Sequence, residues 1–481
     1  MRRRLFVLIS LLWPAAAGLS ATATTPRPNV LLVVVDDLNL TLGAYGNRTV
    51  KSPNIDRLAA RGARFDAAHA QYTLCNPSRV SFLSGRRPET SGVYILGTPA
   101  RTALPDAVML PQLFRQNGYF TAGAGKVFHS AKVNDRASWD FYEDEATQDE
   151  GERAAIAARY GREGGGDGDG RPAWQVLESD GSRTRDGVNT ATIRRLIAEK
   201  SAGNTPFFLA LGFHKPHLPW TAPKRFFDLY PETGIAPQAE PPMRDIPPIA
   251  LQTELSGFGQ PESRAGAIRA YHACISFIDH QLGLVLDELD QRDLTKSTLI
   301  VFFSDHGFHL GDHGGLWAKL SAFRASTRVP LLMAGPGIPA GVAISSPVEL
   351  LDIFPTLAEL AGLPAPGGLE GRSLRATLNG AEAAGRAYSL VFHYDAAANR
   401  DVAGRTVIGP SWRYTEWDEG RAGRELYWHA NDPDEYRNVA GDRDRAELVR
   451  EAGTELARLP RAKEGPANRP RALDRDSKKL K

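Results

Sequence analysis

The sequence predicts an α/β fold with a large, mainly parallel sheet flanked by helices, followed by a smaller C-terminal α+β domain with an antiparallel sheet. Three observations predict it. Apolar, β-branched runs of strand length recur along the chain, and amphipathic helical patterns lie between them. After about residue 380 the pattern changes to short alternating segments separated by turns, which is typical of antiparallel strands.

Four segments have the form of buried strands, with continuous apolar residues in place of an alternating pattern. In chain order they are NVLLVVVDDLN (29–39), TPFFLALGFHKPH (205–217), STLIVFFSDHG (297–307) and VPLLMAGPG (329–337). The first three end in acidic or basic residues. Because ligands bind an α/β sheet outside the carboxyl ends of its parallel strands, these polar ends predict the position of a functional site.

The helical patterns between the strands have recognisable ends. Ser52 or Asn54 is expected to cap a helix over residues 54–65, and Gly118 is a stop signal for the helix over 110–118. Another helix begins near Cys75, where Pro77 suits the first turn, and ends at Gly85. Two longer amphipathic patterns cover 268–293 and 349–363.

The chain divides into a leader, two domains and a tail. Residues 1–23 have the basic start, apolar run and small residues of a signal peptide, so we expect a secreted or periplasmic protein without a membrane span. The catalytic domain is predicted at 24–378 and the C-terminal domain at 379–458. The polar, basic segment 459–481 predicts a disordered tail, and the Gly- and Asp-rich segment 161–172 predicts a surface loop.

Charge and cysteine count narrow the class of protein. The formal net charge of +2 gives no argument for a nucleic-acid or membrane partner, so any anionic substrate needs a local basic pocket. The chain has two cysteines, too few for a disulfide scaffold. One structural bridge between Cys75 and Cys274 is an alternative to a functional cysteine.

Acidic residues at two strand ends predict a metal site. Asp36 and Asp37 follow the apolar residues of the segment 29–39, and Asp305 and His306 follow those of the segment 297–307. Carboxylates packed together repel one another unless a cation lies among them. Oxygen ligands suit Ca²⁺ or Mg²⁺, whereas a histidine ligand favours Mn²⁺ or Zn²⁺. The alternative is that each Asp caps the next helix or turn, but two paired strand ends favour the metal.

The segment CNPSR (75–79) predicts an anion site. Cys75 and Asn76 lie at the N-terminus of the expected helix, where exposed N–H groups and the helix dipole favour an anion. Arg79 lies about one turn further on and can reach the same space. A nucleophile at this position would meet an anionic ester whose charge is already balanced.

These residues carry a resemblance to a known family. CNPSR followed by SFLSGRRP resembles the signature of the sulfatases, which have an alkaline-phosphatase-like fold, and the likeness extends from Asn29 to about Ala440. The segments GKVFHS, GFHKPHLPW and GDHGGLWAKLS are most similar to the iduronate-2-sulfatase branch. The resemblance implies that a formylglycine-generating enzyme oxidises Cys75 to 3-oxoalanine (formylglycine), whose hydrate is the nucleophile. It argues against a Cys75–Cys274 bridge and leaves Cys274 as an inert buried thiol.

The resemblance also implies the ligands and the catalytic residues. One divalent cation is expected, Ca²⁺ ahead of Mg²⁺ or Mn²⁺, and its ligands are Asp36, Asp37, Cys75, Asp305 and His306. Many sulfatases have Asn at the position of His306. The implied catalytic residues are Cys75, Arg79, Lys126, His129, His214 and Lys319.

Each of these residues has an implied role. Arg79 holds the hydrated aldehyde and Lys126 bridges hydrate and sulfate. His129, spaced Lys-x-x-His from Lys126 as in the iduronate-2-sulfatase branch, helps to break the hemiacetal. Lys319 contacts the sulfate, and His214 is the expected general acid. Two further candidates for substrate contact are His217 and His313.

The expected function is hydrolysis of sulfate monoesters on a sulfated sugar or uronic-acid-containing glycan, as in glycosaminoglycan degradation. One alternative is a phosphonate or phosphodiester hydrolase on the same scaffold. Another is a non-catalytic glycan-binding relative, which a missing Cys or Asp in the motifs would have favoured; none is missing.

Overall fold

The computed structural model describes residues 27–144, 147–160, 174–237, 239–252, 261–381 and 385–462. The predicted signal peptide, the whole of the predicted loop at 161–172 and residues 463–481 of the predicted tail lie outside these residues. None of the described helices is long and apolar enough to cross a membrane.

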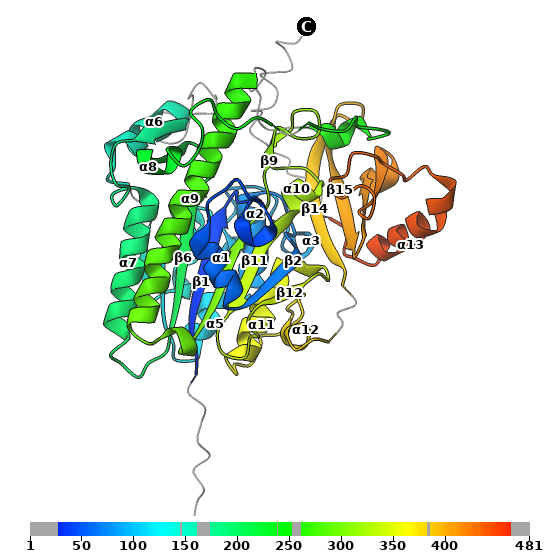
Figure 1. Cartoon of the computed structure of the whole chain (residues 1–481). Coiled ribbons are helices and arrows are strands. Elements are labelled where there is room, and N and C mark those ends of the chain that lie inside the picture. The colour runs from blue at the N-terminus through cyan, green and yellow to red at the C-terminus, as the bar shows by residue number, and fades with distance from the viewer. Residues whose placement is uncertain are drawn as a thin grey trace, which may run out of the picture.

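A nine-stranded sheet forms the centre of the larger part of the molecule (Figure 1). The strands run in the order β12-β2-β11-β8-β1-β6-β3-β4, and β13 also pairs with β2. Their bounds are β1 (Asn29–Asp36), β2 (Ala63–His69), β3 (Phe120–Gly125), β4 (Phe141–Glu143), β6 (Phe207–Pro216), β8 (Thr298–Ser304), β11 (Arg328–Ala334), β12 (Val342–Ile344) and β13 (Val348–Glu349). The central strand β1 is parallel to both β6 and β8, which confirms the mainly parallel sheet.

One predicted strand enters the sheet in the other direction. β11, the VPLLMAGPG run, is antiparallel to both β2 and β8, so the sheet is mixed. The chain leaves β8 at its carboxyl edge and comes back into the sheet from that edge without crossing it, and such a connection gives an antiparallel pair.

Helices cover both faces of this sheet, which explains why its strands are apolar throughout. On β1, Leu31, Val33 and Val35 face one core while the alternate residues face the other. The first core is covered by α1 (Pro53–Ala60), α7 (Arg185–Lys200) and α9 (Pro261–Gln291), and the second by α2 (Cys75–Ser84), α5 (Leu110–Gln116) and α11 (Ile353–Leu360).

Shorter elements join these layers. The short helices are α3 (Pro88–Ser91), α4 (Ala100–Ala103), α6 (Glu150–Tyr160), α8 (Lys224–Phe227), α10 (Arg324–Thr327) and α12 (Arg375–Leu378). Two small sheets pair β5 (Trp174–Leu177) with β7 (Trp220–Pro223), and β9 (His309–Leu310) with β10 (Trp317–Ala318).

The helix expected over 54–65 begins at Pro53, with Ser52 at the N-cap position, but its predicted end is wrong. It stops at Ala60, and residues 63–65 belong to β2. Its N-terminus is not capped by the side chain of Ser52 or Asn54. Asp279 of α9 accepts the N–H groups of Asn54 and Ile55, at 2.9 and 2.8 Å. A carboxylate distant in sequence therefore replaces the expected local cap. The segment 349–363 also divides, into a 3₁₀ turn (Leu350–Asp352) and α11.

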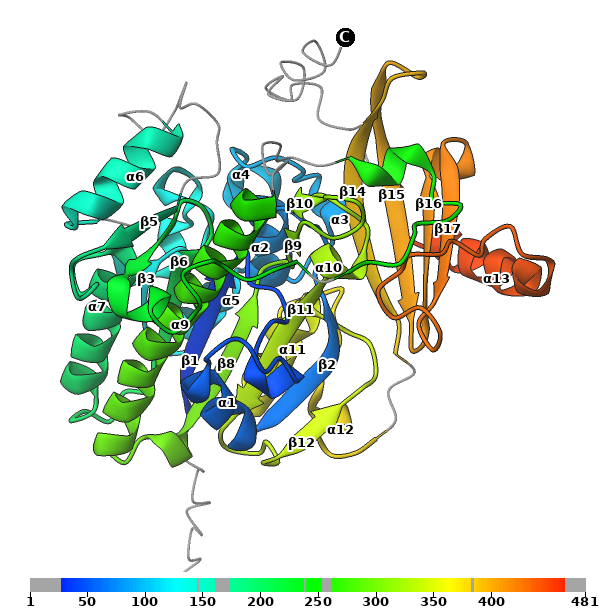
Figure 2. The ribbon, with the colours of Figure 1, turned by 45° about the horizontal axis from the view of Figure 1, so that its top comes forward.

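The C-terminal part forms the predicted antiparallel sheet (Figure 2). Its elements are β14 (Ala387–Asp395), β15 (Arg400–Gly409), β16 (Trp412–Trp417), β17 (Gly423–Trp428) and α13 (Ala446–Ala457). α13 packs on one face, and the other face shares an apolar cluster with Tyr72, Leu320 and Phe323. The sheet thus supports the segments just before Cys75 and just after Lys319. The domain boundaries given above stay predictions.

Candidate active site

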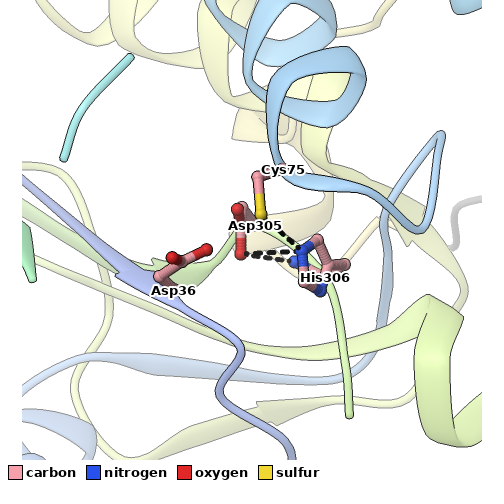
Figure 3. Close-up of side chains that lie close together, drawn as sticks. All are labelled: Asp36, Cys75, Asp305 and His306. Atoms are coloured by element: carbon pink, nitrogen blue, oxygen red, sulfur yellow. Dashed lines mark hydrogen bonds and ion pairs between the residues drawn. The ribbon is translucent and has the colours of Figure 1, made fainter. Parts of the chain in front are cut away.

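The polar ends of β1 and β8 meet at one edge of the sheet, because the two strands are parallel neighbours. Asp36 ends β1 and is followed by Asp37, while Asp305 and His306 follow β8. Cys75 begins α2 above the same edge, and its sulfur points towards them (Figure 3). Ligand atoms of Asp36, Cys75, Asp305 and His306 all lie within 4.8 Å of one another, and those of Asp36, Asp37, Cys75 and His217 form a second such group.

His306 has one ring nitrogen aimed into this group. Its Nε2 lies 3.5 Å from Cys75 Sγ, 3.5 Å from Asp37 Oδ1 and 3.6 Å from Asp305 Oδ1. Its Nδ1 lies 3.0 Å from the carbonyl oxygen of Gly307, a contact in which Nδ1 donates. This bond fixes the ring so that Nε2 has the orientation of a metal ligand.

The two cysteines are both free and buried, so the bridge considered above does not form. Cys75 lies at the first position of α2, and Gly85 ends that helix in the left-handed conformation, as expected. Cys274 lies in α9 within the apolar core, where burial raises the pKa of its thiol to about 12. Cys75, in contrast, lies within the acidic group of Figure 3.

Arg79 is fully buried and joins the two acidic strand ends. Its Nε donates to Asp305 Oδ2 at 2.9 Å and its Nη2 to Asp36 Oδ1 at 3.2 Å, while Nη1 donates to the carbonyl oxygens of Lys126 and Val127. The guanidinium is thus a structural link between β1, β8 and the segment after β3.

Two ammonium groups reach the acids. Lys126 forms an ion pair with Asp36. Lys319 Nζ lies 2.5 Å from Asp37 Oδ1 and 3.2 Å from Cys75 Sγ. Both lysines are almost fully buried, so their charges act at short range in a medium that screens little.

The electrostatics of this group fit a divalent cation. Burial raises the pKa of Asp37 to about 7; the ammonium of Lys319 opposes this shift and the charge of Asp36 adds to it. Burial lowers the pKa of His306, but the carboxylate of Asp305 and the neighbouring Cys75 together outweigh it and raise that pKa to about 9. Asp37 and His306 therefore hold protons near neutral pH, and a cation among these carboxylates would replace that positive charge. Carboxylate oxygens with one imidazole suit such an ion.

Comparison with known proteins decides the family. Residues 28–363 match the family model for sulfatases, and residues 311–462 match the model for the C-terminal region of N-sulphoglucosamine sulphohydrolase. The chain belongs to the sulfatase family. It is therefore a sulfuric ester hydrolase, as the CNPSR signature predicted.

Two relatives and one solved structure show the extent of the likeness. A sulfatase of Formosa agariphila is 34% identical over 451 residues, which cover 86% of this chain and 83% of the relative. Iduronate 2-sulfatase of Mus musculus is 36% identical over 399 residues, 73% of this chain and 71% of the relative. The phosphonate monoester hydrolase of Agrobacterium radiobacter has the same fold, with a TM-score of 0.71 at 24% identity over 90% of this chain and 95% of that one.

Two histidines of the sulfatase lie beside the acids. His214 lies near the end of β6, and its ring centre lies 5.0 Å from that of His217. His217 Nε2 lies 4.0 Å from Asp37 Oδ2, while its Nδ1 lies 2.7 Å from the carbonyl oxygen of Leu218. Burial, with the charge of Lys126, holds the pKa of both imidazoles well below the usual range. Both rings are therefore neutral at pH 7.

The other two predicted histidines differ from each other. His129 is near the site: burial, and then the charge of Lys126, lower its pKa to about 3. The contacts of His313 go elsewhere. Its Nδ1 lies 2.7 Å from Asp312 Oδ1, and its ring stacks on Tyr436 with centres 4.6 Å apart. The structure does not bring His313 to the other site residues.

Two supporting residues were not predicted. Asp186, at the start of α7, accepts the N–H groups of His214 and Lys215 at 2.6 and 3.0 Å. The Ser304 hydroxyl accepts the Leu38 N–H at 3.0 Å and lies 2.8 Å from the His306 carbonyl oxygen. In the sequence these residues look like an ordinary helix start and an ordinary strand residue, so no local signal indicates their contacts.

Proposed function

We propose that this sulfatase hydrolyses sulfate monoesters of a sugar through a formylglycine made from Cys75, with one divalent cation bound beside it. The observation that carries the proposal is the position of Cys75. It lies at a helix N-terminus, 3.2 Å from the ammonium of Lys319 and within the acidic group of Figure 3. Both features favour an anionic ester at this point.

The metal would be held by Asp36, Asp37, Asp305 and His306, with an oxygen of modified residue 75 as a further ligand. Ca²⁺ is the expected ion because carboxylate oxygens dominate the donor set. When bound, it supplies Lewis-acid polarisation of the ester oxygen and favours ionisation of the aldehyde hydrate, whose oxygen is the nucleophile.

The basic residues of the chain bind and orient the sulfate. Lys126 and Lys319 approach the acids from two elements, so an anion between them and residue 75 meets positive charge from both. Arg79 is bonded to Asp36 and Asp305, so it keeps the two strand ends together in addition to the implied role at the aldehyde.

The leaving alcohol needs a proton, and His214 and His217 are the candidates. The sequence favours His214, and His217, whose Nε2 lies 4.0 Å from Asp37 Oδ2, is the second candidate. Because both rings are neutral in the free protein, the general acid must take up a proton before the alcohol leaves. The test compares His214→Gln with His217→Gln on an alkyl sulfate and on an aryl sulfate with a good leaving group. Loss of the general acid is expected to slow the alkyl sulfate far more than the aryl sulfate, because the aryl alcohol leaves without a proton. Equal loss on both substrates would contradict that role.

The substrate proposed is a sulfated uronic acid within a glycan. The relative named iduronate 2-sulfatase, and the segments GKVFHS, GFHKPHLPW and GDHGGLWAKLS, support this choice. We also propose that a formylglycine-generating enzyme is the partner during maturation. We propose secretion or export to the periplasm on the basis of the signal-peptide pattern.

The test has two parts. Protein made together with a formylglycine-generating enzyme is digested, and the mass of the peptide containing residue 75 is measured; conversion of Cys75 is expected. Sulfate release is then measured on defined sulfated monosaccharides and oligosaccharides, beside matched phosphate and phosphonate esters. Faster turnover of the phosphonates would favour the activity of the structural relative. Unmodified, inactive protein would contradict the formylglycine mechanism.

A further inference from the structure

The backbone has an uncommon conformation at one of the proposed metal ligands. Successive side chains of an extended strand point to opposite faces, so Asp36 and Asp37 would not both face the site if β1 simply continued. Asp37 instead has a φ of 62°, in the left-handed region that residues with a Cβ rarely adopt. This turn brings the second carboxylate to the same centre as the first.

A side chain from α9 holds this turn in place. The hydroxyl of Tyr271 donates to the carbonyl oxygen of Asp37 at 2.6 Å and accepts the N–H of Asn39 at 2.9 Å. One hydroxyl therefore bonds the backbone on both sides of Leu38. The backbone N–H groups of Asp37 and Leu38 donate to Asp305 Oδ1 and Ser304 Oγ, and the first of these bonds is long, at 3.4 Å. The Asp37 carboxylate itself is bonded by Lys319.

The ring of Tyr271 is fixed independently of its hydroxyl. It is fully buried, stacks on Phe308 with ring centres 5.5 Å apart, and meets Trp220 edge-on at 6.3 Å. Phenylalanine would fill the same space. The packing function and the hydrogen-bonding function of this residue can therefore be separated by one substitution.

We propose that Tyr271 is a positioning residue for the metal site: its hydroxyl keeps Asp37 in the left-handed turn and so keeps the Asp37 carboxylate on the cation. The inference rests on the proposed metal dependence. Tyr271 touches the Asp37 backbone and no group that reacts. Its effect is expected first in metal affinity and only through that in turnover.

The experiment is a titration of the metal-free full-length protein with Ca²⁺, and separately with Mg²⁺ and Mn²⁺, followed by calorimetry. Tyr271→Phe is expected to weaken binding of the preferred ion by about 10- to 100-fold, the usual effect of losing a group that orients a ligand. At saturating metal its kcat should return close to that of the wild type, which a general folding defect would not allow.

Tyr230→Phe is the matched control. Its hydroxyl is also buried beside α9, and it accepts the Lys51 N–H at 3.1 Å and contacts Ser276 Oγ at 2.6 Å. The Tyr230→Phe variant loses a comparable number of hydrogen bonds in the same core, but these bonds do not involve Asp37. Its metal affinity is expected to equal that of the wild type.

A double variant tests the route of the effect. In Asp37→Asn the charged ligand is already gone, so adding Tyr271→Phe should change metal affinity little further. A full additional loss, or wild-type affinity in Tyr271→Phe alone, would overturn the role of Tyr271. A wild-type protein that binds none of the three ions would instead overturn the proposed metal dependence itself.

Discussion

Among the described residues, two of the buried clusters of charged side chains stabilise their charges in different ways. The catalytic cluster comprises Asp36, Asp37, Arg79, Lys126, Asp305, His306 and Lys319 at the edge of the large sheet. The Arg413 cluster comprises Arg413, Trp417, Glu425, Tyr427, His429 and Glu435 in the C-terminal part. In both clusters the ion-paired side chains are at most 9% exposed.

The Arg413 cluster is closed. Arg413 Nε donates to both carboxylate oxygens of Glu435 at 3.0 Å, and its Nη2 to Glu425 at 3.3 Å. Glu425 also accepts hydrogen bonds from Trp417 and Tyr427, at 2.6 and 2.8 Å. Burial raises the pKa of Glu435, but Arg413 and then His429 outweigh it and hold that pKa well below the usual range. Each charge has fixed partners within the protein.

The catalytic cluster is open by comparison. Adjacent carboxylates face one another, and the pKa of Asp37 is raised to about 7 although Lys319 lies 2.5 Å away. The difference shows that burial alone does not identify a functional site. A structural cluster satisfies its charges with its own residues, whereas a binding site leaves charge that a ligand or metal must complete.

The largest expected effect comes from Cys75→Ala, which should change catalysis at the open cluster without changing the stability of the fold. Turnover should fall by a factor on the order of 10⁴ or more because the nucleophile is lost. The midpoint of thermal unfolding should change by less than about 4 °C, since no closed network is opened. Cys274→Ala is the control and should keep wild-type sulfate release. Sulfate release by Cys75→Ala at the wild-type rate would show that residue 75 is not the nucleophile.

Arg413→Met is expected to have the opposite pattern. It leaves two buried glutamates without their cation, so the free energy of unfolding should fall by about 3–5 kcal/mol. KM and metal affinity of the folded protein should stay as in the wild type. Urea denaturation beside Arg421→Met provides the comparison: Arg421 is 62% exposed in its pair with Asp418, so its loss should change the free energy of unfolding far less. Equal destabilisation by the two substitutions would mean that the Arg413 cluster is not closed.

Asp37→Asn tests the open cluster through the pH dependence of the free energy of unfolding. In metal-free protein the pKa of Asp37 is about 7 when folded, against 3.8 as the ordinary value. Between these values the folded state binds more protons than the unfolded state, so this residue lowers stability as pH rises from about 4 to 7. The asparagine variant should lack this decline and should be more stable at pH 8, by on the order of 2 kcal/mol.

Glu435 is the internal contrast for that experiment. Its pKa is lowered on folding, so it contributes stability above its ordinary pKa of 4.5, and this stability is lost as pH falls. Denaturation curves of wild type, Asp37→Asn and Glu435→Gln at pH 3, 5 and 8, with chelator present, would measure both slopes: that of Glu435 between pH 5 and pH 3, and that of Asp37 between pH 5 and pH 8. A stability of Asp37→Asn that declines with pH as in the wild type would contradict the assignment.

The sequence predicted the parts of the fold that repeat a simple pattern. The apolar runs gave β1, β6 and β8, and the helix from Cys75 to Gly85 formed as expected. β2 was missed because ARFDAAH continues a helical pattern, and its pairing with β11 is decided by tertiary contacts. The direction of β11 depends on the path of the chain after β8, which no local signal records.

The site was predictable to the extent that its residues lie in motifs. Asp36, Cys75 and Asp305 stand at strand and helix ends, where a pattern indicates chemistry. The link from Arg79 to Asp305 spans 226 residues, and the Tyr271 hydroxyl reaches Asp37 across 234. Such contacts depend on how layers pack, so they required the structure.

Glu425→Gln is the smallest effect expected, and it compares neutralisation in the two clusters directly. The amide oxygen of glutamine can still accept the hydrogen bond from Trp417. Its NH₂ group can donate to the Tyr427 hydroxyl, which reverses the direction of that bond. What is lost is the charged contact to Arg413, which is the long one at 3.3 Å and secondary to the two bonds with Glu435. The free energy of unfolding should therefore fall by about 1–2 kcal/mol, measured by urea denaturation, with sulfate release unchanged. Removing one negative charge thus destabilises the closed cluster, whereas the same change at Asp37 stabilises the open one in metal-free protein. The same sign for both substitutions would remove the distinction between the clusters.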